Sequence, residues 1–393
     1  MENYRGVFRV TVFRNILDRL IYNDEYRNIE AGLTDSNVGA RKSRNIRDNI
    51  FVLSAVINDV TNGNAKAVDL QIYDVAKCFD ALWLEEAVSD LYDSGLTNDK
   101  LSLLYMENEV CKVAVKTPAG LSRRVEIPRI VLQGTVFGNL KCTSSMDKIG
   151  KNAYLSKNAI YTYKGSVEIP PLGMVDDELI ISECGNDSVM TNSVINTFIE
   201  SKKLRFAESK CHKIHIGKTN QICPVLQVHG FQMDGSKCEK YLGDLISENG
   251  KIKENIAARR AKGYGLSDGI LAILAEIPLG RYKIEMGLTL RQAMLINGIL
   301  YNSEAWQSIS DGEYKQLEEV DNHFLGKLLG AHSKTSTAFL HLETGTLPIR
   351  FVIANRRLVY YFNIMSKPES ELIHRVFKAQ MLSPTKGDWY NIP

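Results

Sequence analysis

Apolar residues recur with helical spacing early in the chain and then switch to the alternation of a strand. Residues 1–35 and 50–60 carry apolar side chains three and four positions apart, which predicts two helices. Residues 68–73 alternate apolar with polar side chains, which predicts a strand that leads directly into Asp74. The chain therefore starts as a mixture of helix and strand, with an acidic residue at the end of its first strand.

The mixture continues to about residue 245, after which strand signals become rare. The further elements predicted in this first part are helices near 80–93, 138–153 and 188–203, hairpins at 111–127, 160–169 and 172–181, and strands at 212–216 and 241–246. Helical patterns then dominate, at 251–274, 288–300, 314–329 and 349–365. The pattern predicts an α+β fold with a mostly helical C-terminal part and no internal repeat.

Composition excludes several broad classes of protein. Hydrophobic residues make up 44% of the 393 positions and charged residues 24%, so the chain is neither disordered nor collagen-like, and its length predicts about two or three domains. No run approaches the ~20 apolar residues of a membrane-spanning helix, and no secretion signal is evident, so we expect no membrane and an intracellular protein. The seven cysteines lack CxxC pairs, and Cys211 with His212 and His215 lacks a fourth zinc ligand.

The net charge of +2 conceals a sorted distribution of charge. Lys and Arg number 48 against 46 Asp and Glu, which argues against a uniformly basic nucleic-acid coat. Residues 41–47, however, hold four basic side chains and no acid, and residues 251–263 hold five against Glu254 alone. We therefore expect local cationic surfaces and a salt-sensitive grip on phosphates.

Carboxylates occur at two places where a sheet would fix them. Asp74 ends the first predicted strand, and Asp176 and Asp177 form the polar tip between two apolar arms. Converging carboxylates repel one another unless cations lie between them, and two Mg²⁺ ions roughly 3.5–4 Å apart suit in-line phosphoryl transfer. Taken alone, an Asp-Asp pair is more often simply a turn, because Asp favours turns.

An ordered set of short segments changes this balance. The segments are Tyr4-Arg5, 39–48, 74–80 (DVAKCFD), 132–135 (LQGT), 174–177 (MVDD), 209–211 (SKC), 241–243 (YLG) and 342–348 (LETGTLP). Their order and spacing resemble the reverse transcriptase domain of non-LTR (LINE-type) retrotransposons, over roughly residues 1–300 and in part of the tail. Each segment alone is weak, and it is the order that carries the resemblance.

The resemblance implies a right-hand polymerase that extends a DNA primer on an RNA template with dNTPs. Fingers would come from residues 1–65 and an insertion at about 105–150, and residues 66–245 would form a palm with an antiparallel, ferredoxin-like βαββαβ sheet. Residues 246–393 would form a mostly helical thumb and connection region. Such a protein would work in the nucleus, by target-primed synthesis, after a cytoplasmic ribonucleoprotein stage.

The resemblance also assigns catalytic roles. Asp74 and Asp176 would be the principal ligands of two Mg²⁺ ions, for which Mn²⁺ would substitute, and Asp177 would support them. Lys210 would protonate the leaving pyrophosphate or stabilise its charge. Each residue also has an ordinary structural explanation. Lys210, for example, could be a solvated charge at the edge of a strand.

Nucleotide and primer contacts follow in the same way. The ring of Phe79 would exclude a ribose 2′-OH, although a place in the core explains it equally well alone. The other implied nucleotide contacts are Arg5, Arg41 and Arg44 on the triphosphate and Gln133 and Gly134 in the pocket. The implied primer grip is Tyr241, Leu242 and Gly243. The basic run at 41–47 would otherwise be an exposed face.

The sequence departs from the pattern of the family without removing a carboxylate. Leu132 replaces Pro, Gly138 and Asn139 replace Ser and Pro, Met174 replaces an aromatic residue, and Gly6 and Val7 replace Pro and Ile. No endonuclease or terminal Cys/His knuckle is evident, and the fingers look short. We therefore expect a partial polyprotein.

Three alternatives stay open. The first is a catalytically inactive remnant that binds RNA or an RNA–DNA hybrid. The second is another two-metal palm enzyme, such as an RNA-dependent RNA polymerase. The third is an unrelated α/β enzyme. The last would leave the ordered segments unexplained.

Overall fold

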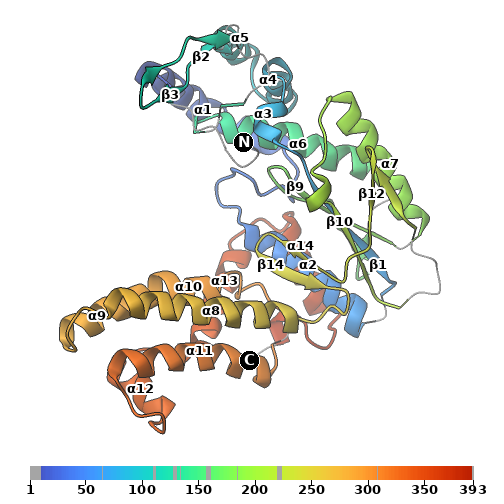
Figure 1. Cartoon of the computed structure of the whole chain (residues 1–393). Coiled ribbons are helices and arrows are strands. Elements are labelled where there is room, and N and C mark those ends of the chain that lie inside the picture. The colour runs from blue at the N-terminus through green and yellow to red at the C-terminus, as the bar shows by residue number, and fades with distance from the viewer. Residues whose placement is uncertain are drawn as a thin grey trace. The chain divides into compact units, whose positions relative to one another are not determined.

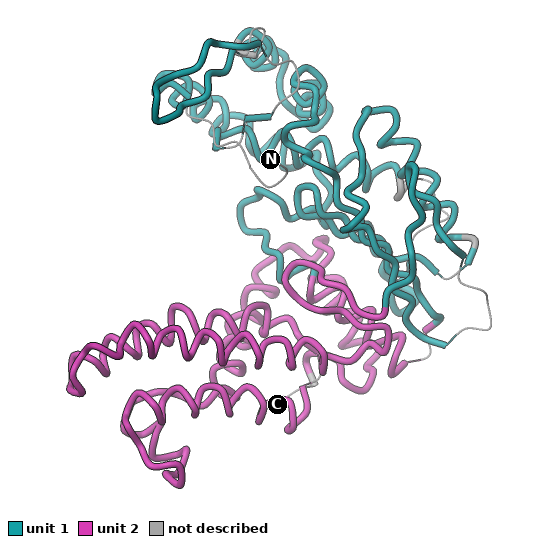
Figure 2. Tube along the Cα trace, in the orientation of Figure 1, with its two compact units in different colours: residues 1–49, 66–236 teal, residues 50–65, 237–393 magenta. Residues whose placement is uncertain are grey.

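The fold is that of a computed structural model, which describes residues 10–63, 65–108, 112–126, 131–132, 134–155, 161–183, 185–218, 224–307 and 309–391. The chain divides into two compact units (Figure 2). Unit 1 comprises residues 1–49 and 66–236, and unit 2 comprises residues 50–65 and 237–393. The predicted division at residues 65 and 245 into fingers, palm and thumb stays a prediction.

A four-stranded antiparallel sheet forms the centre of unit 1 (Figure 1). Its strands, in spatial order, are β10 (His212–Ile216), β1 (Val68–Asp74), β9 (Asp177–Glu183) and β8 (Leu172–Met174). Helices connect β1 to β8 and β9 to β10, so the connectivity is β-α-β-β-α-β. This is the sheet that the sequence predicted, and the mixture of helix and strand is confirmed; its identity as a polymerase palm stays a prediction.

The central strand β1 is buried along its whole length, including its polar positions. Buried polar groups need hydrogen-bond partners, and β1 finds them next to α7 (Asn186–Ser201). The Asp69 carboxylate accepts from Ser188 Oγ at 2.6 Å and contacts His215 Nδ1 at 2.9 Å. The Tyr73 hydroxyl donates to the Gln71 side chain at 2.6 Å. The apolar and the polar side chains of β1 therefore point into two different buried layers, and neither face of the strand is exposed to solvent.

Helices form a large part of the described residues of unit 1 outside the sheet. They are α1 (Val12–Gly32), the start of α2 (Ile46–Asn62), α3 (Cys78–Ala81), α4 (Leu84–Asp93), α5 (Asn98–Asn108), α6 (Gly138–Leu155), α7 and the short 3₁₀ helix η1 (Glu208–Lys210). The predicted single helix at 80–93 is two helices, because Leu82 and Trp83 adopt extended backbone angles between α3 and α4. Helix α5 was not predicted.

Short hairpins complete unit 1. They are β2 (Lys112–Val113) with β5 (Val125–Glu126), β3 (Lys116–Thr117) with β4 (Gly120–Leu121), β6 (Thr162–Tyr163) with β7 (Val167–Glu168), and β11 (Leu226–Val228) with β12 (Phe231–Met233). The first three lie within the two predicted hairpins. The fourth was missed, although Gly230 marks its turn with a φ of 98°.

Unit 2 is mostly helical, as the sequence predicted. Its helices after α2 are α8 (Lys253–Leu274), α9 (Arg281–Leu290), a π-helical segment (Arg291–Ile296), α10 (Asn297–Ile299), α11 (Asp311–Leu329), α12 (Thr337–Thr344), α13 (Ile349–Met365), α14 (Leu372–Leu382) and the 3₁₀ turn η3 (Trp389–Asn391). Helices α12 and α14 were not predicted. None of the helices among the described residues has both the length and the apolar character needed to cross a bilayer.

The predicted strand at 241–246 is strand at Tyr241 and from Asp244 onward, but it is not continuous, because a tight turn divides it. Strands β13 (Cys238–Tyr241) and β14 (Asp244–Ser247) pair antiparallel, with Tyr241 opposite Asp244. Leu242 and Gly243 form the turn between them and have φ angles of 44° and 92°. Two positive φ angles are typical of the tight turns that join paired strands.

A buried carboxylate, Asp244, ties this hairpin to the helices of unit 2. Asp244 is 2% exposed and accepts hydrogen bonds from Arg259 at 2.7 Å, Asn255 at 2.8 Å and Asn302 at 3.0 Å. The Trp306 indole nitrogen lies 3.3 Å from both carboxylate oxygens. Arg259 is itself buried, so the ion pair balances two charges that solvent does not reach.

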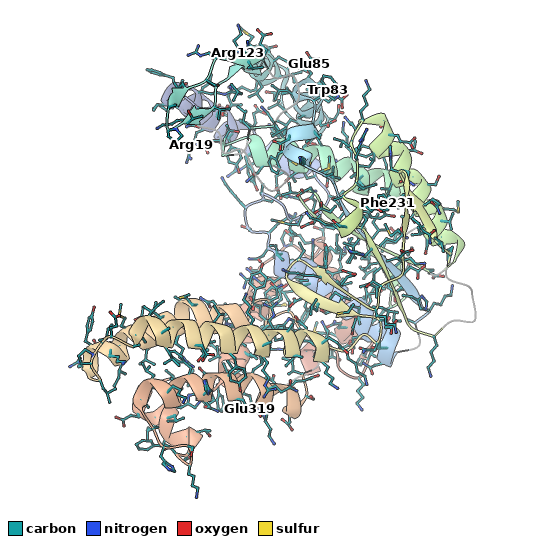
Figure 3. All side chains as sticks on the ribbon, in the orientation of Figure 1. Arg19, Trp83, Glu85, Arg123, Phe231 and Glu319 are labelled. Atoms are coloured by element: carbon teal, nitrogen blue, oxygen red, sulfur yellow. The ribbon has the colours of Figure 1, made fainter. Side chains whose placement is uncertain are left out.

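We predict that Asp244→Asn destabilises the protein by about 3 kcal/mol or more, because it leaves the buried Arg259 guanidinium without its counter-charge. Urea unfolding measures the change. The matched control is Glu319→Gln on α11 (Figure 3), because Glu319 pairs with the neighbouring Arg260 at 2.9 Å while both side chains are about half exposed. We expect the control to change stability by less than about 1 kcal/mol. Equal effects of the two substitutions would contradict this account of unit 2.

Candidate functional site

Three aspartates lie together at one end of the central strands of unit 1. Asp74 is the last residue of β1 and is paired directly with Asp177, the first residue of β9. Asp176 precedes Asp177 in the turn that joins β8 to β9. The Asp177 carboxyl is close enough to Asp74 and Asp176 for both to raise its pKa. The structure thus brings together the three carboxylates that the sequence singled out, although they lie about a hundred positions apart along the chain.

The turn that carries Asp176 has an unusual backbone. Met174 pairs with Asp177, which leaves Val175 and Asp176 as a two-residue hairpin loop. Val175 has a φ of 62°, a conformation that a β-branched residue adopts only under strain of roughly 1–3 kcal/mol. Its side chain packs against the apolar cluster of unit 1, which helps to hold the turn.

A loop from the N-terminal part of the chain clamps this hairpin. The backbone of Gly173 in β8 exchanges hydrogen bonds with Val38 N at 2.9 Å and Ser36 O at 3.1 Å, and Asn49 Nδ2 adds a third at 3.0 Å. A Cβ on Gly39 would lie 2.6 Å from Val175 N, so only glycine fits there. Sequence reasoning missed this clamp, because nothing in the pattern of residues 36–39 links them to β8.

Arg41 and Arg44 hold the clamp in place. Arg41, whose side chain is fully buried, makes two bonds to the Glu30 carboxylate at 2.7 and 2.8 Å, and Arg44 pairs with Glu30 and Asp35 at 3.1 Å each. Burial alone would raise the pKa of Glu30, but the hydrogen bonds and charges of the two arginines outweigh burial and lower it. Both guanidinium groups are therefore engaged within the fold. Their expected contact with a triphosphate stays a prediction without geometric support.

Lys210 reaches the aspartates from η1. Its Nζ lies 2.8 Å from Asp74 Oδ2, while the rest of its side chain is about half exposed. The hydrogen bond to Asp74, together with the charges of the three aspartates, raises the pKa of Lys210, so it is an ammonium at neutral pH. The backbone supports this approach, because Ala207 N donates to Asp74 O at 2.9 Å.

The aspartates crowd negative charge into a half-buried place. Burial raises the pKa of Asp177 to about 7, with further contributions from the charge of Asp176 and from the hydrogen bond and charge of Asp74, while Lys210 opposes the shift. On the next residue, burial and the charges of Asp147 and Asp177 raise the pKa of Glu178 well above its usual value. The site would therefore gain stability from added positive charge.

Oxygen donors of this kind suit Mg²⁺ chemically. Among the residues that the structure describes, however, no group of three or more acidic, His or Cys side chains is arranged to hold a metal ion. Lys210 already occupies one oxygen of Asp74. A metal would need Lys210 to turn away and the three carboxylates to close around the ion, and the exposed stem of Lys210 permits that movement.

The structure describes only two of the four remaining residues that are expected to contact a nucleotide. Phe79 lies in α3, half-buried against the apolar cluster, and its carbonyl accepts from Val131 N at 2.6 Å. Gly134 has a φ of 93°, which explains glycine there by backbone geometry alone. Arg5 and Gln133 lie outside the described residues. The roles of all four in binding a nucleotide stay predictions.

The expected primer grip forms the turn between β13 and β14. Tyr241 is 2% exposed and belongs to the core of unit 2, while Leu242 and Gly243 are half-buried in the turn. Arg259 and Asn302 bond to the carbonyls of Gly243 and Leu242, at 2.7 and 3.2 Å. The geometry explains these residues as a braced turn, and their contact with a primer stays a prediction.

Comparisons with known proteins give only distant likenesses. No family model and no curated protein matches the chain. Among solved structures, telomerase from Candida albicans with the TWJ fragment of telomeric RNA is 13% identical at a TM-score of 0.42, over 85% of this chain and 56% of that one. Telomerase from Candida tropicalis with the same kind of RNA fragment is 12% identical at 0.43, over 94% and 57%. Apo telomerase from Candida tropicalis is 14% identical at 0.40, over 92% and 60%.

This chain spans less than two thirds of each of those telomerase chains. At TM-scores below 0.5 the likeness does not establish a shared fold. The function proposed below therefore depends on the order of the sequence segments and on the geometry of the aspartates.

We predict that Asp177→Asn makes the protein more stable than the parent at about pH 8 and that the difference disappears at about pH 4. A carboxyl whose pKa is raised by folding stabilises fully below its unfolded pKa, and this contribution is lost as the pH rises through the folded pKa of about 7. The gain at high pH should be on the order of 4 kcal/mol, since each of the roughly three pKa units contributes about 1.4 kcal/mol, and urea unfolding measures it. The exposed Asp99 of α5 supplies the control, Asp99→Asn. A gain independent of pH would contradict the crowding of charge.

Proposed function

We propose that the chain is an RNA-directed DNA polymerase of a non-LTR retrotransposon. The single observation that carries this proposal is the meeting of Asp74 with Asp176 and Asp177 at the end of β1, opposite β9. In the sequence these aspartates belong to two separate segments, and each segment resembles part of the reverse transcriptase pattern. A chance resemblance gives no reason for both segments to fold to the same end of one sheet.

The aspartates would hold two Mg²⁺ ions, or Mn²⁺ in their place, with Asp74 and Asp176 as principal ligands and Asp177 in support. Such ions activate an attacking 3′-hydroxyl and stabilise a leaving pyrophosphate. The chain's own residues position the reactants and supply charge. Lys210, charged at neutral pH and half exposed, would donate a proton or a hydrogen bond to a departing phosphate oxygen.

Selection of deoxynucleotides would come from Phe79. This residue follows Asp74 by five positions and lies on α3, which begins four positions after the strand ends. A half-buried ring held by the apolar cluster cannot move away at low cost, so it would exclude a 2′-hydroxyl by its volume. RNA template, DNA primer and dNTPs are the proposed partners, and the nucleus, after a cytoplasmic ribonucleoprotein stage, is the proposed place of synthesis.

A second candidate function is a catalytically inactive module that binds RNA or an RNA–DNA hybrid. The ion pair between Lys210 and Asp74 favours it, together with the lack of a ready metal-binding group among the described residues. In that case the ammonium would permanently replace the ion as the counter-charge of the aspartates.

Primer extension separates the two candidates. We expect the parent to extend a DNA primer on an RNA template with Mg²⁺ and dNTPs, and Asp176→Ala to lose about a thousandfold or more in rate. Asp99→Ala, which removes an exposed acid from α5, should keep the parent's rate. No extension by the parent, with retained binding of an RNA–DNA hybrid, would favour the inactive module.

The role of Phe79 has its own test. The parent should discriminate strongly against ribonucleotides, and Phe79→Val should lose most of that discrimination while keeping the rate with dNTPs within about tenfold, because only the 2′-hydroxyl gains room. Single-nucleotide incorporation with dNTPs and NTPs measures the ratio. A parent that incorporates both equally well would count against the assignment as a reverse transcriptase and towards an RNA-dependent RNA polymerase.

A further inference from the structure

Helix α13 (Ile349–Met365) has a buried face that attaches it to unit 2 (Figure 1). The central residues of this face are spaced three and four positions apart and are Ile353, Arg357, Tyr360 and Ile364. The centre of the Tyr360 ring lies 6.1 Å from that of Phe51, and the Arg357 guanidinium donates to the carbonyl of Trp389 at 2.7 Å. One face of α13 is therefore enough to hold the helix in its unit.

The opposite face of α13 is also apolar, but it is exposed. With about 3.6 residues per turn, this side of the helix carries Phe351, Leu358, Phe362 and Met365. These four residues are 43–61% exposed. From Phe351 to Met365, a stretch that the structure describes throughout, no exposed side chain carries a charge. Single exposed apolar residues are common, but a helix that is apolar on two opposite faces is typical of one with a neighbour on each side.

The exposed face has the spacing of a coiled-coil seam. Together with the exposed Asn355, its four apolar residues follow one another at intervals of four, three, four and three positions. These are the a and d positions of a heptad, which face a second helix. Asn355 falls on an a position, where a single polar residue specifies the register of a pair at a cost in stability. The α13 seam is the set of Phe351, Asn355, Leu358, Phe362 and Met365.

Opposite charges lie at the two ends of the α13 seam. Arg350 precedes the seam, and its half-exposed side chain pairs with the exposed Asp311, a contact that holds it only weakly. After Met365 comes the C-terminal end of α13, where the helix dipole is negative, and then Glu369, which forms a surface pair with Lys378. Two such helices that run antiparallel would bring each Arg350 to the negative end of the other helix. A parallel pair would bring the two arginines together.

The α13 seam is complementary to itself in both apolar surface and charge. In an antiparallel pair centred on Leu358, that residue meets its own counterpart, and Arg350 of one copy reaches Ser366, the cap at the end of the other helix. Asn355 lies across from Tyr361 of the second copy, and the amide and the hydroxyl can form a hydrogen bond. Self-complementarity of this kind is what an interface with twofold symmetry requires. A second copy of the chain is therefore the partner that fits the seam.

We propose that the α13 seam is a dimer interface, on which a second copy of this chain packs antiparallel with Leu358 at the centre. Helix α13 has 17 residues and is thus about 25 Å long, so the seam is small by the standards of specific interfaces. The dimer should therefore dissociate on dilution. The inference does not depend on the proposed polymerase activity, because no residue of the seam belongs to the aspartate site.

Sedimentation velocity of the full chain over a ~100-fold range of concentration tests the proposal. We expect the parent to pass from monomer to dimer. Leu358→Glu should weaken the association by about a hundredfold or more, because two carboxylates would meet at the centre of the interface. Leu358 is exposed in the single chain, so the substitution leaves the core intact, and an unchanged urea midpoint verifies this. Met106→Glu, at an exposed apolar position of α5, is the matched control and should dimerise as the parent does.

Cysteine cross-linking tests the orientation of the two copies. Arg350→Cys is mixed with Ser366→Cys, one of them carrying a tag that changes its size, and the parent gives the background from its native cysteines. Under mild oxidation we expect disulfides between the two different variants, whereas links between like variants alone would contradict the antiparallel arrangement.

Two results of the sedimentation experiment would overturn the proposal. One is a parent that stays monomeric at every concentration, which would leave a different protein, or another segment of a longer chain, as the occupant of the α13 seam. The other is a Leu358→Glu variant that dimerises as the parent does, which would place the interface on another surface.

Discussion

The register between β1 and β9 is the constraint on which the site depends. It sets Asp74 directly opposite Asp177 and makes Val175 and Asp176 the two-residue loop at the same end of the sheet. A slip of one residue would move every side chain of a strand to the other face. The register is fixed by burial, because both strands are buried through their middle and the polar residues of β1 find partners only in this arrangement. The stability of the sheet therefore holds the carboxylates together, although their negative charges repel one another.

Two kinds of support keep this costly arrangement in place. The loop of residues 36–39 clamps β8, and Arg41, paired with Glu30, holds that loop. On the other side the segment before η1 pairs with the end of β1 and delivers Lys210 to Asp74. Positive charge thus reaches the aspartates through Lys210, which contacts Asp74.

The elements with strong periodicity and the three aspartates could be predicted from the sequence. The contacts that hold the aspartates in place could not. Alternation at 68–73 and the apolar arms around Asp176 and Asp177 identify the sheet, because burial on both faces demands such patterns. The roles of Arg41 and Arg44 could not be foreseen, since an arginine paired with a distant Glu30 looks the same in sequence as one that faces solvent. The break at Leu82 and the turn at Leu242 were missed because tertiary packing, not local propensity, holds them.

The proposed function requires that the three aspartates bind divalent cations once Lys210 moves away from Asp74. Crystals of the full chain soaked in Mn²⁺ test it most directly, through anomalous scattering from the ion. We predict anomalous density between the carboxylates of Asp74 and Asp176, with Lys210 Nζ displaced from Asp74, and no such density in crystals of Asp176→Ala. Soaked parent crystals in which the Lys210–Asp74 ion pair is intact and no anomalous density lies at the aspartates would contradict it.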